Sequence, residues 1–264
     1  MSSSDHNLWA MLALQDRLFA IPALSVQTIT IAPAVTKVPT LPGHVRGVMN
    51  LRGQIIPLID LRERLGMTSL NSEAIAFCDM MHQREQDHKN WINELQASVT
   101  EQREFKLTTD PHKCAFGKWY DTFKTDNVTI SAILARFEAP HQRIHAIGEQ
   151  VKSMAAKGEH SAASALIDRC RDTELSEMIH LFGTLREAYT DCAREIAVVV
   201  NHNDLLLAFA VDAIDSISEL ATGSTVSLDE AGAGLTSTEF VASVGRTKGN
   251  DRFVLILDLN KLLG

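Results

Sequence analysis

Hydrophobic and polar positions near both ends of the chain form short apolar segments that are separated by polar turns. Within residues 8–70 the apolar positions show no helical periodicity, and the same pattern of short apolar segments returns from Ile196 onward. This pattern is typical of β-strands bounded by turn residues. It predicts strands over residues 8–14, 18–21, 45–50, 55–61, 196–200, 205–211, 239–244 and 253–259.

The middle of the chain, from about Ser72 to about Ala193, has a different pattern. Apolar residues recur three and four positions apart among glutamine, histidine, methionine, alanine and charged residues. That spacing matches the period of an amphipathic α-helix, so this segment is predicted to be helical.

The two predicted β segments share the pattern DLxxxLG, which begins at Asp60 and again at Asp258. A weaker match relates Ile21–Leu24 to Val211–Ile214. Two similar small β-barrels are the simplest account of this repeat, with the helical segment inserted between them as a separate domain. The expected fold is therefore α+β and multidomain. The repeated aspartates are interpreted as turn or helix-cap residues.

Composition and charge narrow the class of function. The 264 residues are 45% hydrophobic, as in a packed globular protein, and the formal net charge is −8. This charge, without a run of lysine or arginine, argues against nucleic acid or an anionic membrane as the partner. The sequence shows no signal peptide and no apolar run near the ~18 residues of a membrane span, so a cytoplasmic location is expected. In that reducing compartment the four cysteines, which form no CxxC pair, are not expected to build a disulfide scaffold.

The helical segment contains two histidines, His141 and His145, at a spacing that suits a shared metal ion. Side chains four residues apart lie on one face of a helix, about 5–6 Å from each other. Pro140 helps to fix where this helix begins. For such a pair taken alone, two solvated or packed histidines are the alternative.

Two further segments strengthen the metal interpretation, because each combines a potential ligand with aromatic residues. They begin at His88 and at Cys114. The tryptophans that follow, Trp91 and Trp119, are interpreted as core residues that pack around the ligands. The candidate metal ligands are His88, Cys114, His141 and His145.

The spacing of HxxW, CxFGxW and HxxxH at these residues resembles that of the chemoreceptor zinc-binding (CZB) domain, over about residues 76 to 190. The resemblance implies a helical bundle that holds one zinc ion through three histidines and one cysteine. It also implies sensing of zinc or of hypochlorous acid through Cys114. Four protein ligands would leave no position for a reactive water, which disfavours hydrolysis. Oxidation of the Cys114 thiolate would remove one ligand.

Two other interpretations of this site stay open. A zinc hydrolase could use His88, His141 and His145 with a bound water, and Cys114 would then be a bystander. Alternatively, the zinc could be purely structural.

Three cysteines and one histidine have no partner at a recognisable ligand spacing. The cysteines are interpreted as small buried apolar side chains, and a resolving role for one of them stays open. The histidine is interpreted as solvated or as a neighbour of the ligands. These residues are Cys78, Cys170, Cys192 and His112.

The two β segments resemble the CheW family of chemotaxis coupling proteins over residues 8–70 and 195–264. The resemblance implies two SH3-like five-stranded β-barrels that bridge chemoreceptor cytoplasmic tips to the regulatory domain of a histidine kinase. No P-loop, GxGxxG helix start or nucleophile elbow occurs in the sequence, so an enzyme is not expected. The resemblance is carried by Leu18–Pro22, Val26, Val45–Gly53, Ile56–Leu61 and Leu207–Asp212.

The same resemblance assigns two partner-binding residues. Arg52 matches an arginine that is important for receptor coupling, and Val26 matches a groove position. On the residues alone, Arg52 would be a solvated turn residue and Val26 a core residue of a strand. Thr28 stands where coupling proteins often have an acidic residue, so receptor or kinase contact is expected to be altered. The sequence leaves open whether the chain forms a homodimer through the helical insert.

Overall fold

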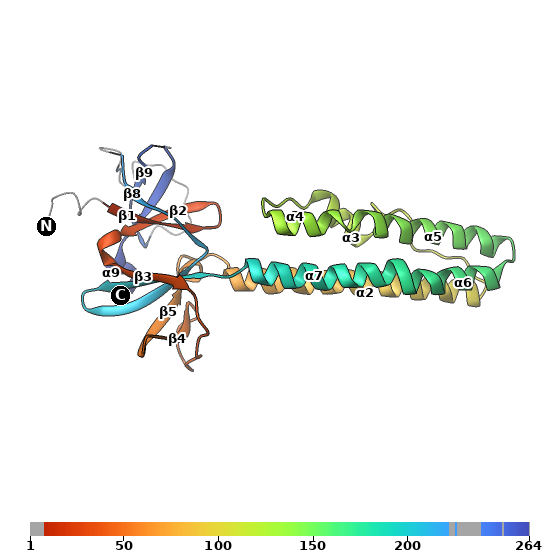
Figure 1. Cartoon of the computed structure of the whole chain (residues 1–264), viewed down its shortest axis with the longest axis horizontal. Coiled ribbons are helices and arrows are strands. Elements are labelled where there is room, and N and C mark those ends of the chain that lie inside the picture. The colour runs from red at the N-terminus through yellow and green to blue at the C-terminus, as the bar shows by residue number, and fades with distance from the viewer. Residues whose placement is uncertain (1–7, 222–224, 226–238, 250, 264) are drawn as a thin grey trace. The chain divides into compact units, whose positions relative to one another are not determined.

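The computed structural model describes residues 8–221, 225, 239–249 and 251–263, and it divides into two compact units (Figure 1). The host unit comprises Met1–Glu73 and Ala193–Gly264 and contains the described strands. The helical unit comprises Ala74–Cys192. The fold is α+β and multidomain, with a helical region inserted into a β-rich chain.

The host unit is built on two five-stranded sheets, with the strand orders β8-β1-β2-β10-β9 and β3-β6-β7-β5-β4. Neighbouring strands are antiparallel except at one position in each sheet, where β10 pairs parallel with β2 and β5 pairs parallel with β7. The strands are β1 (Leu8–Leu14), β2 (Arg17–Pro22), β3 (Val26–Ile31), β4 (Val45–Leu51), β5 (Gln54–Asp60), β6 (Ile196–His202), β7 (Leu205–Val211), β8 (Ala213–Glu219), β9 (Val241–Arg246) and β10 (Phe253–Leu257).

Each sheet contains strands from both β segments of the sequence. The hairpin β1–β2 lies in one sheet with β8, β9 and β10, and the hairpin β6–β7 lies in the other with β3, β4 and β5. Exchanging β1–β5 with β6–β10 converts one strand order into the other, so the sequence repeat is also a structural repeat. The two expected five-stranded units are present, but neither is formed by a single copy. A hydrophobic pattern indicates which face of a strand is buried and does not identify its pairing partner.

The central strands of both sheets are buried on both faces. On β2, Phe19 belongs to the main core of the host unit, whereas Leu18 and Ala20 belong to a smaller core on the opposite face. On β6, Val198 belongs to the main core and Val199 to a third core. Strands that are buried on two faces have continuous apolar sequences rather than alternating ones, which explains why the sequence pattern identified them.

Two edge strands, β3 and β8, are not among the strands predicted from the sequence. Their side chains are half-buried and exposed in turn, so no continuous apolar segment marks them. The alternation itself is the signal of a strand with one solvated face, and it could have identified both.

The repeated aspartates begin short helices, as predicted. Asp60 is the N-cap of α1 (Leu61–Arg64), where its side chain accepts a hydrogen bond from a backbone N–H of the first turn at 3.1 Å. Asp258 precedes α9 (Leu259–Leu263) and accepts from the backbone N–H of Asn260 at 3.0 Å and from that of Lys261, the equivalent of the Asp60 bond, at 3.4 Å. Both carboxylates therefore satisfy N–H groups that would otherwise have no partner at a helix start. Gly264, which ends the second DLxxxLG pattern, lies outside the described residues.

Two arginines hold the host-unit residues that flank the insertion. Arg62 donates through Nη1 to Glu73 Oε2 at 2.7 Å. Arg46 donates through Nη2 to Asp60 Oδ2 at 2.6 Å and to Glu195 Oε1 at 2.8 Å. Glu73 and Glu195 lie next to the two ends of the insertion. The two chain segments that lead into the helical unit are therefore held to the host unit by ion pairs.

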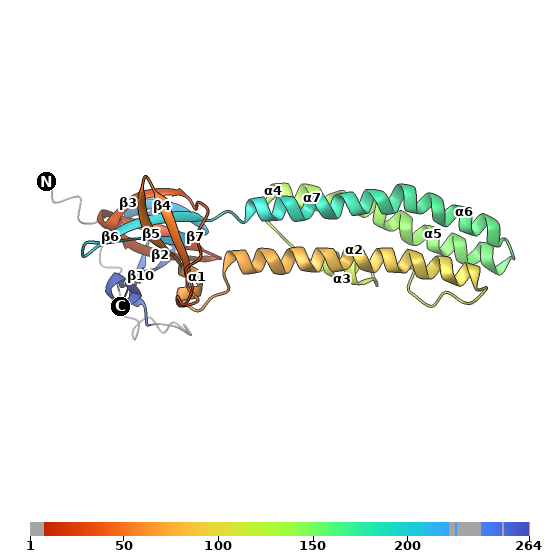
Figure 2. The ribbon, with the colours of Figure 1, turned by 90° about the horizontal axis from the view of Figure 1, so that it is seen from below.

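The helical unit contains long helices that lie along one another (Figure 1, Figure 2). In the antiparallel pair α2 and α7, Arg186 donates to Glu85 at 2.8 Å, and the rings of Phe77 and Tyr189 stack with centroids 3.7 Å apart. A π-helical turn, Arg171–Leu175, joins α6 to α7. The helices are α2 (Leu70–Thr100), α3 (Ala115–Thr122), α4 (Val128–Ala135), α5 (Glu138–Ala156), α6 (His160–Cys170) and α7 (Ser176–Cys192).

These helices agree with the helical segment predicted over residues 72–193. They share one core of buried side chains, which includes Met81, Ile92 and Ile144. Within the described residues, no helix combines the length and the apolar character that a membrane span requires.

Candidate metal centre

Helix α5 supplies two of the candidate ligands. His141 and His145 are one helical turn apart, and their ring centroids lie 4.9 Å from each other. Pro140 lies in the first turn of the same helix, where a proline is tolerated because the N–H it lacks has no intrahelical partner. Both histidines are buried, with 4% and 1% of their surfaces exposed. The i, i+4 spacing therefore places two imidazoles together inside the helical unit.

Helix α2 supplies His88, whose ring orientation is fixed by the backbone. Its Nδ1 lies 2.8 Å from the carbonyl oxygen of Arg84, one turn earlier, so Nδ1 carries the proton that it donates. The lone pair on Nε2 is then available to a metal, and Nε2 is buried without a hydrogen-bond partner. Both ring nitrogens of His145 are also buried and unpartnered. Buried polar atoms without partners are rare, and a metal ion bound by these nitrogens would give them partners.

The fourth candidate, Cys114, begins helix α3. Its Sγ accepts a hydrogen bond from the backbone N–H of Gly117 at 3.1 Å and lies 3.2 Å from Nε2 of His141. The thiol donates to the carbonyl oxygen of Pro111 at 3.3 Å. The loop of residues 101–114 thus ends with its cysteine sulfur directed at the histidines of α5.

The four ligand atoms form one cluster. One nitrogen from each of His88, His141 and His145, together with Sγ of Cys114, all lie within 4.8 Å of one another. In tetrahedral zinc sites with bonds of about 2.0–2.3 Å, ligand atoms are separated by roughly 3.3–3.8 Å. The cluster therefore needs only a small contraction to hold one zinc ion, and its nitrogen and sulfur donors are of the type that zinc prefers.

Burial keeps the imidazoles neutral. Desolvation, followed by the charges of His88 and His145, lowers the pKa of His141 to about 3. Desolvation and the charge of His88 lower the pKa of His145 to about 4, and burial also lowers the pKa of His88. Burial raises the pKa of the Cys114 thiol, against the effect of the backbone N–H groups of Gly117 and Phe116. The neutral imidazoles offer free lone pairs near pH 7, and metal binding would have to displace the thiol proton.

Aromatic rings enclose the cluster, as the sequence predicts for the tryptophan of HxxW. The centroid of Trp91 lies 5.1 Å from that of His145, and its Nε1 donates to the carbonyl oxygen of Thr108 at 2.8 Å. Phe116 lies 5.0 Å from His141 in an edge arrangement. These contacts help to fix the rotamers of the ligands.

Sequence reasoning missed Gly148, which makes room for Trp91. A Cβ at this position would lie 2.4 Å from the end of the tryptophan ring. The glycine lies inside helix α5, three residues after His145. A glycine in a helix interior costs stability relative to alanine, and that cost is the signal that could have pointed to a close contact.

The other cysteines and His112 lie outside the cluster. Cys170 is fully buried, and desolvation raises its pKa to about 12. Cys78 is half-buried beside the Thr190 hydroxyl, whereas Cys192 is exposed and so differs from the expectation of a buried side chain. His112 is exposed and lies 3.0 Å from an Asp121 oxygen, in agreement with the solvated interpretation.

The two predicted partner-binding residues lie in the host unit. Arg52 is exposed at the tip of the β4–β5 hairpin with φ of 51°, and Gly53 follows with φ of 91°. The Asn50 side chain accepts a hydrogen bond from the Gly53 N–H at 2.8 Å and holds this turn. Val26 and Thr28 are half-buried on β3, where Val26 packs against the main core.

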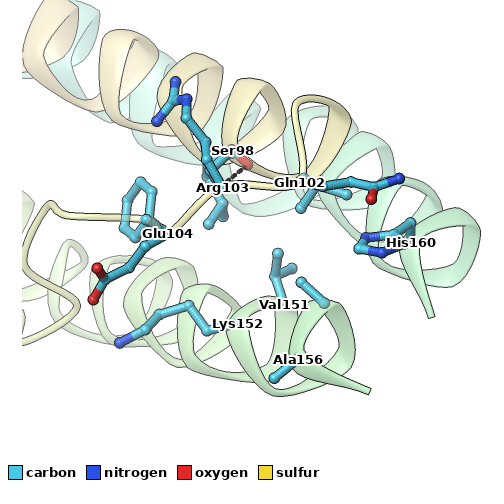
Figure 3. A pocket seen from close by; sticks show the side chains of 12 residues that line it. Ser98, Gln102, Arg103, Glu104, Val151, Lys152, Ala156 and His160 are labelled. Carbon is cyan, nitrogen blue, oxygen red and sulfur yellow. Dashed lines mark hydrogen bonds between the residues drawn. The ribbon is translucent and has the colours of Figure 1, made fainter. Parts of the chain in front are cut away.

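A separate cavity of about 290 Å³ lies between the end of α2 and helices α5 and α6 (Figure 3). Two of its charged residues are already paired, since Arg103 bonds to Glu94 at 2.5 Å and Lys152 lies 3.4 Å from Glu149. Ser98 in its wall donates to the carbonyl oxygen of Leu95 at 2.7 Å. This cavity resembles a packing defect at a bundle end more than a reactive site.

Comparison with known proteins gives matches to two families. The model of the CheW-like domain matches residues 9–85 and 174–264, and the model of the chemoreceptor zinc-binding domain matches residues 88–152. The chain is 44% identical to a chemotaxis protein CheW of Helicobacter pylori over 52 residues, which are 20% of this chain and 32% of that protein. It is 37% identical to a probable chemotaxis protein CheW of Rhizobium etli over 67 residues, 25% of this chain and 43% of that protein.

These aligned segments span less than half the length of the relatives. Among solved structures, the scaffolding protein TtCheW from Thermoanaerobacter tengcongensis aligns with a TM-score of 0.45 at 14% identity, covering 97% of this chain and 91% of that one. The CheW-like model matches more than half of the chain on both sides of the insertion, so the chain belongs to the CheW-like family and carries a chemoreceptor zinc-binding domain within it.

Proposed function

We propose that this chain is a chemotaxis adaptor in which one zinc ion, held by the helical unit, controls how the host unit joins a chemoreceptor to a histidine kinase. The cluster of four donor atoms within 4.8 Å, inserted between the halves of a CheW-like domain, carries the proposal. The buried, unpartnered imidazole nitrogens support it, because a bound cation would complete their interactions.

The position of Cys114 favours a closed site over a hydrolase. Its sulfur lies 3.2 Å from Nε2 of His141 and within 4.8 Å of the other donor atoms, which supports the role of a ligand over that of a bystander. Zinc that activates water needs an open coordination position, which a fourth protein ligand occupies. We therefore assign the zinc a regulatory role and assign the chain no reaction of its own.

Cys114 is also the ligand through which the site could respond to an oxidant. A thiolate can be oxidised to a sulfenic acid, which no longer offers an anionic sulfur to a metal. Helix α2 carries His88 and, in its first turn, Glu73, which is bound to Arg62 of the host unit. A change at the ligands can thus reach the host unit along one uninterrupted helix.

For the host unit, we assign receptor contact to Arg52 and groove contact to Val26. The exposed guanidinium at a rigid hairpin tip is suited to an acidic partner surface. Thr28, which lies beside Val26 on β3, carries no charge and would weaken or redirect a contact that other members make through an acidic residue.

Metal analysis tests the site directly. Wild-type protein purified without chelator is expected to contain about one equivalent of zinc, whereas Cys114→Ala and His145→Ala lose most of it. His112→Ala is the matched control, because this exposed histidine lies two residues from Cys114 and outside the cluster. Less than about half an equivalent in the wild type would overturn the site.

Cobalt substitution separates the four-ligand site from the hydrolase alternative. An intense thiolate-to-metal charge-transfer band in the wild type, absent from Cys114→Ala, is expected. A wild-type spectrum without that band, together with an exchangeable water, would instead support the three-histidine site.

Pull-down of a chemoreceptor tip and of the kinase regulatory domain, with and without zinc, tests regulation. Zinc removal is expected to change the amount of receptor tip or kinase domain that is captured, while the helix content of the chain is preserved. If zinc removal unfolds the helical unit and leaves capture unchanged, the zinc is purely structural. Sedimentation of the same samples would show whether the helical unit forms a homodimer.

A further inference from the structure

A pocket of about 840 Å³ in the helical unit lies directly beside the metal centre. Three of the four candidate ligands, His88, Cys114 and His145, form part of its wall. Cys114 is only half-buried, so its sulfur lies at the boundary between the ligand cluster and this pocket. A small molecule in the pocket could therefore reach the sulfur without unfolding the helices.

The pocket wall combines apolar surface with charge. Trp91, Phe116 and Leu107 contribute apolar surface, and the charged residues of the wall are Arg84, Asp87, Glu94 and Lys113. Glu94 is paired with Arg103 and Lys113 with Asp110, so Arg84 is the cation of the wall that is considered for a ligand. A volume of this size falls in the range of about 300–1,000 Å³ that is usual for small-molecule sites. The chemistry of the wall suits a compact ligand with both an apolar part and an acidic group.

Arg84 provides a specific hydrogen-bond donor that has no acceptor. Its Nη1 donates to Asp87 Oδ2 at 2.7 Å, but its Nε is buried and has no partner. This N–H leaves no room for a water-sized molecule, so it reaches a ligand carboxylate only when the partly exposed Arg84 side chain turns into the pocket, where the guanidinium can bind the carboxylate.

The other cysteines are not placed to react with Cys114. Cys170 is enclosed in the core, Cys192 is exposed at the end of α7, and Cys78 contacts Arg186 and Thr190. In the described part of the chain, the pocket wall contains no cysteine besides Cys114. An oxidised Cys114 therefore needs a thiol from solution to form a disulfide.

We propose that this pocket binds a low-molecular-weight thiol that carries a carboxylate, and that oxidised Cys114 forms a mixed disulfide with it. The Arg84 guanidinium, turned into the pocket, binds the carboxylate and orients the thiol toward Cys114. This inference rests on the proposed redox role of Cys114 and adds the chemical class of its second reactant. The adduct would keep the sulfur away from the metal until a reductant removes it.

The chemistry proceeds in two balanced steps. In the first, the Cys114 thiolate takes the oxygen and hydrogen of hypochlorous acid, the O–Cl bond breaks, and chloride leaves with the electron pair, which gives a sulfenic acid. In the second, the small thiol attacks Sγ of Cys114, the S–O bond breaks, and the hydroxide leaves with the thiol proton as water. The cysteine loses two electrons in the first step, and the second joins the two sulfurs.

The test uses zinc-loaded full-length protein treated with one equivalent of hypochlorous acid and then with thiol. Glutathione carries carboxylates, and 2-mercaptoethanol is the matched thiol without one. Peptide mass mapping is expected to find the glutathione adduct at Cys114. Arg84→Gln should slow adduct formation with glutathione about tenfold and leave the reaction with 2-mercaptoethanol unchanged. The control Arg136→Gln, at an exposed arginine on the end of α4, should change neither rate.

A measurement on the wild type does not depend on the variant folding. S-methylglutathione cannot form a disulfide, and it should slow the labelling of the Cys114 sulfenic acid by dimedone. If dimedone labels Cys114 but neither carboxylate effect is seen, the pocket inference is overturned and the redox role stands. If dimedone labels no Cys114 after oxidation, both proposals fail.

Discussion

Replacing Gly117 with alanine is expected to weaken zinc binding, because helix α3 lies too close to the preceding loop for a side chain at this position. A Cβ there would lie 1.8 Å from the carbonyl oxygen of Pro111, a backbone atom that cannot rotate away. Helix and loop would have to separate by roughly 1 Å to relieve the overlap. The loop ends at Cys114, whose Sγ accepts the Gly117 N–H bond at 3.1 Å.

The size of the effect follows from this geometry. Metal–ligand distances tolerate only about 0.2 Å, so the metal-free chain can relax the overlap whereas the zinc-bound chain cannot. Overpacking of this kind costs about 1–3 kcal/mol, which corresponds to zinc binding roughly 5- to 150-fold weaker. Competition against a chromophoric chelator measures the zinc affinity, and circular dichroism verifies the helix content.

Gly183→Ala provides the matched control. Gly183 lies inside helix α7, and a Cβ there meets nothing within 4 Å. Alanine at this position should leave zinc affinity unchanged and stabilise the helix by about 0.5–1 kcal/mol. A zinc affinity for Gly117→Ala within about twofold of the wild type, with normal helix content, would show that the close approach of Gly117 to Pro111 does not control zinc binding.

Stability measurements on both units offer two more tests. Arg46→Ala removes the partner of two buried carboxylates and should lower the free energy of unfolding of the host unit by about 3–5 kcal/mol in urea titrations. Arg17→Ala, which breaks only an exposed 4.0 Å pair, should cost less than about 1 kcal/mol, and equal losses would contradict the buried network. In the zinc-free protein, the pKa values of His141 and His145 are about 3 and about 4, below the ordinary value of 6.5 for an imidazole. As the pH falls, protons therefore bind to the unfolded chain before they bind to the folded chain, and the folded state loses stability. The melting temperature of the zinc-free helical unit should therefore fall between about pH 6.5 and pH 4, and a constant value over that range would exclude buried neutral imidazoles.

The candidate ligands could be predicted because their chemistry depends on local spacing. His141 and His145 share a helix face by helical geometry alone, and the motifs at His88 and Cys114 pair ligands with packing residues. The wall of the neighbouring pocket could not be predicted in the same way. Arg84 is one of several charged residues on helix α2, and only the fold shows that it lines the same pocket as Cys114.

In the host unit too, local sequence patterns predict elements but not the long-range contacts between them. Buried strands such as β6 and β7 were identifiable from continuous apolar sequence, and the DLxxxLG repeat identified two helix starts. The partners of the strands depend on contacts between residues far apart in the chain, as do the bonds of Arg62 to Asp212 and of Arg46 to Glu195. No local pattern in the sequence predicts such contacts.

The interleaved sheets also determine the order in which the chain can acquire its structure during synthesis. Strands β1 to β5 leave the ribosome first, but neither sheet can be completed until β6 to β10 follow. The residues of the helical unit are contiguous, so it can fold and take up zinc while the first host strands still wait for their partners. Metal supply during translation would then influence how long the unpaired strands stay exposed to aggregation.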